Sequence, residues 1–292
     1  MVNELCNSTS KKTRNTGATE QCFEGLLEIP FLAKKKFRFA TLAESKSLVA
    51  WKTAIKNKDI VPLFDAHAVA QANTAAKKFE EGNFTHITDP AVKKTKLECY
   101  LGLCSHRALK SFNNSEYTQV FEFLKGGGIV CVDAGSGKIK GQDLSDLYVG
   151  IRNIATKDKP PFTEVEFTYK DYNELEDGAI IINPDWDKTD LYGIFDVKLI
   201  YVSSSATALK FKAVTGCGTD LVTDLVSADL VLKTAAGAVI TPTFVAADTD
   251  GVYQYTGVSL ADNSVLAVNG VVTKPEIFYE GENTITFTFG LS

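Results

Sequence analysis

The fold class is decided by residues 117–141, which read YTQVFEFLKGGGIVCVDAGSGKIKG. The side chains of residues 117–124 alternate as they do in a β-strand, whose successive residues point to opposite faces. Two β-rich runs, 128–133 and 138–141, then flank Ala134-Gly135-Ser136-Gly137. Because glycine tolerates the positive φ of tight turns, this segment predicts a β-hairpin.

The same glycine-rich segment ends in Lys138 and therefore also resembles a phosphate-binding loop. Such a loop requires a glycine where this chain has Val132, and a serine or threonine where it has Ile139. The spacing excludes the phosphate loop and favours the turn.

Further β-rich runs lie on both sides of this segment and outnumber the helical signals in residues 23–205. One main helix is predicted over residues 42–56, because Thr41 and Glu44 form a capping-box pattern and Trp51 and Ile55 lie on one apolar stripe. A short helix is predicted over residues 105–112. The other predicted strands are 36–39, 60–64, 97–103, 147–154, 163–169, 178–182 and 192–202.

Residues 66–94 form a long, mostly polar connection in which Phe84 and Ile87 are isolated apolar residues. Ordinary connections have a median of ~4–6 residues, so a connection this long is either functional or ordered by contact with something else. We therefore take Phe84 and Ile87 as candidate subunit contacts. The other candidates are a basic cluster and the aromatic residues beside it: Lys34, Lys35, Lys36, Phe37 and Phe39.

The two ends of the chain differ in composition from the middle. Residues 1–22 are polar without apolar periodicity and predict an extended arm. Residues 206–292 hold four lysines against nine carboxylates, whereas the rest of the chain is balanced in charge. The break coincides with the small polar residues 203–207, which suit a linker.

Residues 206–292 are predicted to form a separate immunoglobulin-like β-sandwich, because short β-rich runs follow one another between Gly, Asp and Asn turns. The domains expected are thus an arm (1–22), a β-rich assembly domain (23–205) and this sandwich. The predicted strands of the sandwich are 209–214, 230–232, 239–245, 252–256, 265–268 and 284–289. The fold class expected is mainly β, with a sandwich- or barrel-like first domain that carries one main helix.

Composition excludes several classes of protein. With 292 residues, 45% of them hydrophobic, the chain is long enough for a sizeable core. A net charge of -5 provides no basic field for non-specific nucleic-acid binding. Apolar runs are shorter than the ~18 residues that cross a bilayer, and the N-terminus lacks the apolar core of a signal peptide. We therefore expect a soluble protein made in a cytosol, with its six cysteines reduced and Cys99 in the core.

The sequence contains no motif for catalysis, cofactor binding or metal binding in its required context. Asp185 and Asp187 flank Trp186, a pattern that suits a sugar-binding enzyme, but a charged turn explains the same residues. Asp248 and Asp250 favour a β-turn over a calcium site. The three histidines, His67, His86 and His106, are scattered along the chain. We predict no catalytic residue, no cofactor and no metal site, and do not expect an enzyme.

The arm, the helix, the long connection and the acidic sandwich together resemble the organisation of tailed-bacteriophage virion proteins, most of all the major tail tube proteins. That family pairs a β-rich tube domain, with one helix, a long inter-strand loop and a terminal arm, with an optional immunoglobulin-like decoration domain. Residues 128–154, with the Asp133-Ala134-Gly135 turn and Leu147-Tyr148-Val149-Gly150, also resemble structural proteins of phages that infect Bacteroidetes.

The resemblance implies a homo-oligomer of stacked rings or a tube, in which the long loop and the arm cross between rings and the sandwich faces outward. It implies other virion proteins as partners, passage of DNA without specific binding, no membrane partner, and a place in a virion assembled in the host cytoplasm. The same layout suits a head auxiliary protein or a head-tail ring protein. Alternatives of other classes are a carbohydrate-binding or adhesive module that uses Trp186, Tyr192 and nearby acids, and a β-rich glycosidase. The glycosidase would use carboxylates from two acidic clusters: Asp171, Glu174, Glu176 and Asp177, and Asp185 and Asp187.

Overall fold

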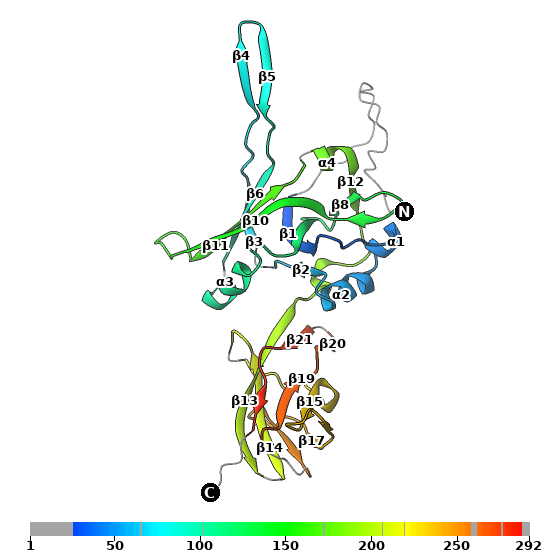
Figure 1. Cartoon of the computed structure of the whole chain (residues 1–292), viewed down its shortest axis with the longest axis vertical. Coiled ribbons are helices and arrows are strands. Elements are labelled where there is room, and N and C mark those ends of the chain that lie inside the picture. The colour runs from blue at the N-terminus through cyan, green and yellow to red at the C-terminus, as the bar shows by residue number, and fades with distance from the viewer. Residues whose placement is uncertain are drawn as a thin grey trace. The chain divides into compact units, whose positions relative to one another are not determined.

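The computed structural model is mainly β, as predicted, and its chain divides into one unit that ends at Leu191 and a second that begins at Tyr192 (Figure 1). The structure describes residues 26–64, 66–100, 102–171, 173–205, 207–218, 220–257, 262–275 and 277–287. The predicted arm, residues 1–22, lies outside them. Among the described residues, no helix is both long enough and apolar enough to cross a bilayer.

The first unit is built on a ten-stranded antiparallel sheet. Its strands are β1 (Leu27–Lys34), β2 (Ile60–Pro62), β3 (Ala66–Gln71), β6 (Lys94–Cys99), β7 (Tyr117–Leu124), β8 (Ile129–Asp133), β9 (Ile139–Lys140), β10 (Gln142–Asn153), β11 (Phe162–Tyr169) and β12 (Ala179–Ile182). The main path runs β12-β8-β7-β10-β11-β6-β3, with β1 on β7 and β2, and β9 on β8. The sequence-predicted strands at 117–124, 163–169 and 178–182 are confirmed.

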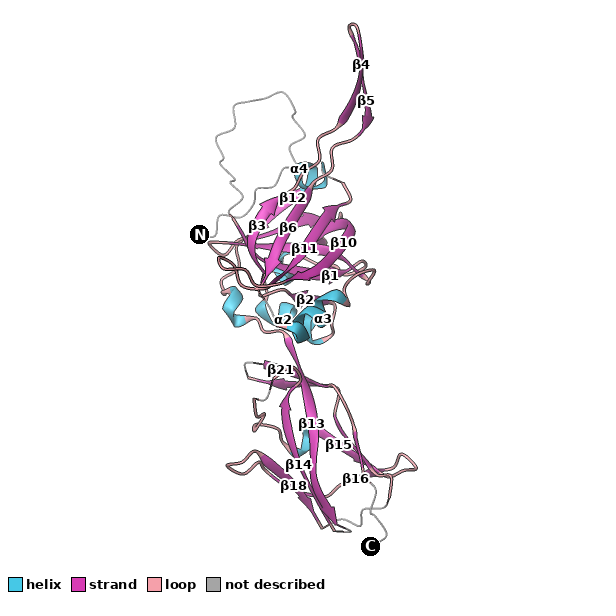
Figure 2. Ribbon diagram, turned by 90° about the vertical axis from the view of Figure 1, so that its left-hand side faces the viewer, coloured by secondary structure: helices cyan, strands magenta, loops and turns pink. Residues whose placement is uncertain are grey.

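The helices of this unit are α1 (Leu42–Ser45), α2 (Leu48–Lys56), α3 (Leu103–Lys110), α4 (Asn173–Gly178) and the 3-10 turn η1 (Lys188–Asp190). The predicted helix 42–56 is thus interrupted. The Glu44 amide donates to Thr41 Oγ1 at 3.1 Å, as expected, but the Glu44 carboxylate accepts from the Ala40 amide at 2.6 Å instead of the cap amide. Ser47 then caps α2. Helices α2 and α3 lie at the same end of this unit (Figure 2), on opposite sides of it in Figure 1.

An aromatic core joins α2 to the sheet. Trp51, fully buried, contacts the rings of Phe39, Phe121 and Phe123 at centroid distances of 5.0, 5.1 and 5.2 Å. Its indole nitrogen donates to the Ser45 carbonyl at 2.8 Å, at the end of α1. The predicted stripe of Trp51 and Ile55 is therefore confirmed as the face of α2 that packs on the sheet.

The predicted glycine-rich hairpin is also confirmed. Strands β8 and β9 pair through Val132 with Lys140, and Gly135, Ser136 and Gly137 all have positive φ. Beyond it, Gly141 packs against β7, where a Cβ atom would lie 2.7 Å from the Val120 carbonyl oxygen. Only glycine allows β10 to begin this close to β7.

The second unit is a sandwich of two sheets. The six-stranded sheet has the order β17-β18-β14-β13-β21-β20, and the four-stranded sheet the order β16-β15-β19-β22. One core, which includes Leu209 and Phe211 of the first sheet and Leu232 and Leu266 of the second, lies between them. The strands are β13 (Ile194–Ser205), β14 (Ala208–Thr215), β15 (Leu230–Lys233), β16 (Val239–Ile240), β17 (Thr243–Val245), β18 (Val252–Thr256), β19 (Val265–Val268), β20 (Val271–Lys274), β21 (Ile277–Gly281) and β22 (Ile285–Thr286), with the 3-10 turn η2 (Ser227–Asp229).

The boundary between the units differs from the predicted one at residues 203–207. Strand β13 pairs with β14 and β21, so it belongs to the sandwich, and the three serines are the end of a strand and not a linker. The charge break therefore falls inside a β-hairpin, because it follows the local distribution of lysines and not the limits of the fold.

Four other strand predictions are corrected by the structure. Residues 36–39 are not a strand, and only Phe39 forms an isolated bridge, to Ile139. Strand β6 ends at Cys99, and Leu103 begins α3 with 64% of its surface exposed. The run 239–245 is divided between β16 and β17, and β22 is shorter than the predicted 284–289, of which residues 288 and 289 lie outside the described chain.

The oxidation state of the cysteines agrees with the prediction only in part. Cys99 and Cys131 are buried thiols, and burial raises the pKa of the Cys131 thiol far above its ordinary value. Cys104 and Cys217, by contrast, are disulfide-bonded. The expectation of reduced thiols is wrong for these two residues.

Candidate interaction surface

The long connection is a projecting β-hairpin, which the sequence did not predict. Beyond the main sheet, β3 and β6 continue through a bridge between Thr74 and Val92 into β4 (Lys77–Glu81) and β5 (Phe84–Asp89). Figure 1 shows this β4–β5 hairpin standing clear of the sheet. Gly82 has a φ of 58°, which suits the first position of the two-residue tip.

Every residue of β4 and β5 is exposed. Large apolar side chains are among them: Phe79 is 49%, Phe84 60% and Ile87 55% exposed. Single exposed apolar residues are common on protein surfaces, but several on one short projection make it a candidate interaction site.

The register assigns these side chains to the two faces of the hairpin. Phe79 lies opposite His86, and Glu81 opposite Phe84. Residues directly opposite share a face, so Phe79, Phe84 and His86 form one surface, here called the aromatic face. The Phe84 and His86 rings stack at a centroid distance of 6.4 Å and an interplanar angle of 14°. Ile87, opposite Lys78, lies on the other face.

Few contacts within the chain stabilise the hairpin. At its base Lys77 Nζ lies 2.9 Å from the Asp89 carboxylate, and both side chains are mostly exposed. Exposed ion pairs contribute little, and an isolated two-stranded hairpin is marginally stable in water. The aromatic face is therefore presented by a segment that the fold of one chain does not need.

The basic cluster and its aromatic neighbours are divided by the structure. Lys35 and Lys36 are exposed, whereas Lys34 lies 3.3 Å from the Glu116 carboxylate and 3.6 Å from that of Asp59. Phe39 is only 1% exposed and Phe37 packs on it at 4.9 Å. Phe39 belongs to the aromatic core and is not on the surface, which corrects its choice as a subunit contact. The hairpin residues Phe84 and Ile87 are on the surface.

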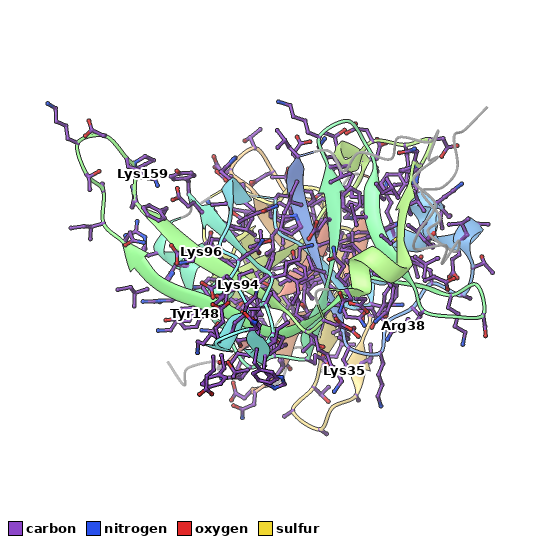
Figure 3. All side chains as sticks on the ribbon, turned by 90° about the horizontal axis from the view of Figure 1, so that it is seen from above. Lys35, Arg38, Lys94, Lys96, Tyr148 and Lys159 are labelled. Atoms are coloured by element: carbon purple, nitrogen blue, oxygen red, sulfur yellow. The ribbon has the colours of Figure 1, made fainter. Side chains whose placement is uncertain are left out.

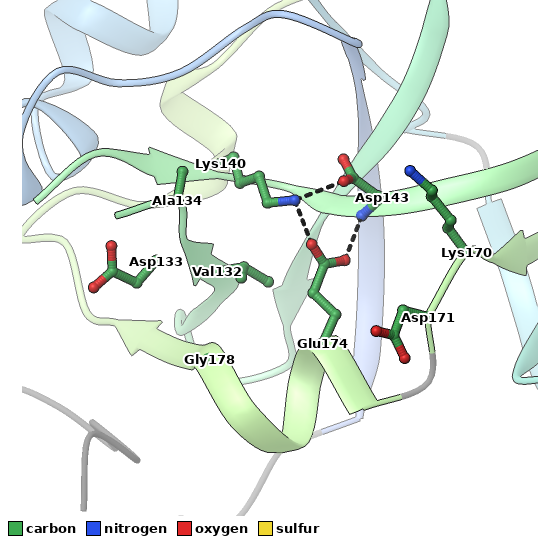
Figure 4. Close-up of a pocket in the computed structure, with 9 residues that line it drawn as sticks. All are labelled: Val132, Asp133, Ala134, Lys140, Asp143, Lys170, Asp171, Glu174 and Gly178. Carbon is green, nitrogen blue, oxygen red and sulfur yellow. Dashed lines mark hydrogen bonds and ion pairs between the residues drawn. The ribbon is translucent and has the colours of Figure 1, made fainter. Parts of the chain in front are cut away.

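A pocket of about 540 Å³ lies beside α4 (Figure 4). Within it Lys140 Nζ lies 2.7 Å from the Asp143 carboxylate and also contacts that of Glu174, which accepts from the Asp143 amide at 2.8 Å. Burial raises the pKa of the Asp143 carboxyl, but hydrogen bonds from Lys140 and Gln119 outweigh it and hold that pKa below its ordinary value. Lys140 pairs with both carboxylates and Glu174 also accepts from the Asp143 amide, so this cluster ties α4 to β10.

The outer face of β6 and β11 carries ion pairs that join the two strands, and Figure 3 labels their lysines, Lys94 and Lys96. Lys94 Nζ lies 2.7 Å from the Glu166 carboxylate, and Lys96 Nζ 2.9 Å from that of Glu164. The hydrogen bond from Lys94 is the main reason that the pKa of Glu166 lies below its ordinary value. These lysines and glutamates are paired within the chain, so they indicate a solvated sheet surface.

Trp186, one aromatic residue of the sugar-binding alternative, packs against the aromatic core. The Trp186 indole nitrogen donates to the Lys46 carbonyl at 2.6 Å, and its ring contacts those of Trp51 and Phe123 at 6.1 and 6.2 Å. Asp187 caps η1, and hydrogen bonds from the Thr189 amide and hydroxyl lower its pKa. These residues hold the chain against the aromatic core.

The remaining residues singled out from the sequence also have local roles. His67 packs on Tyr100 at 5.7 Å, and His106 Nδ1 lies 2.8 Å from the Thr163 hydroxyl. The Asp248 carboxylate accepts from the amides of Asp250 and Val252 at 2.9 Å, which confirms the predicted turn. Within the described residues, no group of three His, Cys, Asp or Glu side chains is arranged to hold a metal.

Comparison with known proteins adds little. No family model matches the sequence, and no curated protein matches it. A solved structure titled "Crystal structure of Hcp protein" is similar to part of the chain, at 12% identity and a TM-score of 0.22, over 49% of this chain and 88% of that chain. Values this low leave the assignment to the geometry of the chain itself.

Proposed function

We propose that the protein is a structural subunit that assembles with copies of itself into rings or a tube, through the aromatic face of the β4–β5 hairpin. One observation carries the proposal: a hairpin whose residues are all exposed presents Phe79, Phe84 and His86 on one side, and nothing in the described part of the chain buries them. Aromatic residues are enriched in the buried centres of protein interfaces, where they supply large contact areas.

The position of the hairpin favours an assembly of repeated copies. The hairpin projects from one end of the first unit, whereas α2 and α3 lie at the other end (Figure 2). A contact from one end of a subunit to a different surface of the next is heterologous, and such contacts generate closed rings or open tubes. We propose the tail tube of a phage as the most specific form of this function, because a β-rich domain, a long inter-strand projection and a separate β-sandwich are its expected parts. The role in a virion belongs to the same proposal.

The proposal is tested by replacing the aromatic face. Full-length protein and the double variant Phe79→Ser, Phe84→Ser are concentrated and compared by sedimentation velocity and negative-stain microscopy. We expect rings or tubes from the unaltered protein and monomers from the variant, because serine removes the apolar area available for contact.

A matched control alters the other face of the same hairpin, as Lys78→Ser with Thr85→Ala. These residues are also exposed, and the control should assemble as the unaltered protein does. Equal assembly of all three proteins would show that the aromatic face is not the contact. An unaltered protein that stays monomeric at every concentration would refute self-assembly.

A further inference from the structure

The outer face of the six-stranded sheet in the second unit carries three lysines. Leu199 and Phe211 point into the sandwich core, so the alternate residues of β13 and β14 point outward. The outward set includes Lys198, Lys210 and Lys212, with Ile200 directly opposite Lys212. We call these four residues the basic face.

This face is unusual in its charge. The second unit holds five lysines and ten carboxylates, and three of the five lysines are on this surface. Of the other two, Lys274 forms an ion pair with Asp229 at 2.5 Å, and Lys233 is on the other sheet. The described, paired positions 198–200, 208–214 and 252–256 hold no carboxylate, whereas Asp196, two residues before Lys198 on β13, and Glu280, the partner of Asp196 on β21, border these positions. A patch of lysines, bordered by two carboxylates, therefore lies within a strongly acidic unit.

The basic face also has apolar surface at its centre and edge. Ile200 is 41% exposed, and Val245, opposite Gln254 on the same side of the sheet, is 47% exposed. Lysines around exposed aliphatic side chains suit a protein surface that offers carboxylates around an apolar residue, because both kinds of group then find a partner.

The chain itself offers such a surface. Two neighbouring loops of the second unit carry Asp220, Asp248 and Asp250, all exposed. The loops are adjacent, since a Cβ atom at Gly251 would lie 2.9 Å from the side chain of Leu221. Leu221 is 45% exposed. We call this surface the acidic loop pair.

We propose that the basic face is a docking surface for the acidic loop pair of a second copy of this chain. Charge complementarity carries the proposal: lysines around Ile200 on one surface match aspartates beside Leu221 on the other. The two surfaces differ, so the contact is heterologous and suits a repeating assembly. The inference rests on the proposed self-assembly and adds to the hairpin a second contact between copies, one that depends on salt.

The test is a charge exchange in the full-length protein. Two double variants are made: Lys198→Glu with Lys212→Glu, and Asp220→Lys with Asp250→Lys. Each places like charges together at the contact, so each alone should need an about tenfold higher protein concentration for half-assembly. A 1:1 mixture of the two should assemble at a lower concentration than either, because opposite charges meet again between unlike copies. Lys233→Glu, an exposed lysine on the other sheet, is the matched control and should leave assembly unchanged. Thermal unfolding followed by circular dichroism checks that all variants fold.

Cross-linking provides the second measurement. Unlabelled and ¹⁵N-labelled copies are mixed, assembled and treated with a carbodiimide, which joins lysine and carboxylate groups in direct contact. We expect mixed-isotope peptides that join Lys198 or Lys212 to Asp220 or Asp250. Assemblies that form without such peptides, and that tolerate both charge variants, would refute the docking surface while leaving the hairpin contact in place. A failure of the unaltered protein to assemble would refute the proposed function, and this contact with it.

Discussion

The first unit places the same kind of side chain in two opposite environments. Around Trp51, the rings of Phe39, Phe121 and Phe123 are at most 2% exposed. On the β4–β5 hairpin, Phe79 and Phe84 are about half exposed or more. Burial of a phenylalanine contributes roughly 1.5–3 kcal/mol to stability, a gain that the hairpin side chains largely forgo in a single chain. The difference shows which aromatic residues serve folding and which are available for contact with another molecule.

The largest effect on stability is expected from Trp51→Ala. Removal of a fully buried indole leaves a cavity among rings at 5.0–5.2 Å and frees the Ser45 carbonyl, and such changes cost about 3–5 kcal/mol. Urea unfolding of the full-length protein measures the loss. A loss of less than about 1 kcal/mol would contradict the central role of this residue in the core.

Smaller losses of stability are expected at two glycines, Gly141 in the main sheet and Gly82 in the hairpin. Gly141→Ala forces a Cβ against the Val120 carbonyl at 2.7 Å, so about 1–3 kcal/mol should be lost. Gly82→Ala meets no atom within 4 Å and adds only the strain of a left-handed residue, about 1 kcal/mol, to a segment outside the core. Urea unfolding of both variants compares them, and equal losses would contradict the close approach of β10 to β7.

The two regions should also differ in their response to acid. The pKa of Asp143 is lowered in the folded protein, so its contribution to stability is complete above the ordinary pKa of about 3.9 and is lost as the pH falls through the folded value. In a plot of the free energy of unfolding against pH, Asp143→Asn should therefore reduce the slope of the acid limb. Asp89→Asn, in the exposed ion pair of the hairpin, should leave that limb unchanged. Identical curves for both variants would contradict the role of the Lys140 cluster.

The smallest effect on stability is expected on the hairpin itself. Phe79→Ser and Phe84→Ser alter exposed residues and should each change the unfolding free energy of the monomer by less than about 0.5 kcal/mol. The same variants should abolish assembly, so stability and assembly are separated. A large loss of monomer stability would show that the aromatic face packs within its own chain.

Much of the fold was predictable because its signals are local. The alternation at 117–124, the glycine turn at 134–137 and the apolar stripe of α2 all follow from residues close in sequence. The limits of the sandwich were not predictable in this way, since β13 is assigned to it by pairing with β21, far along the chain. Charge composition gave a boundary inside the β13–β14 hairpin because it carries no information about pairing.

The candidate site was predicted in part. Phe84 and Ile87 were singled out as isolated apolar residues in a long polar connection, and both are on the surface, while their role as subunit contacts stays a prediction. The strands that present them were missed. Periodicity fails here because both faces of β4 and β5 are exposed and no apolar face is selected. The signal that was available is Gly82-Asn83, a two-residue turn pattern between residues that pair. Phe39 was misassigned because sequence does not show that it bridges to Ile139 in the core.

The two-residue repeat of the β4–β5 hairpin restricts how this segment can change in evolution. Adding two residues to each arm lengthens its reach and keeps Phe79 and Phe84 on the same side. Inserting a single residue at the start of one arm turns every later side chain of that arm over, or forces a bulge. Insertions and deletions among homologues should therefore occur in matched pairs around Gly82, and a molecule with a longer reach can arise without redesign of the contact it makes.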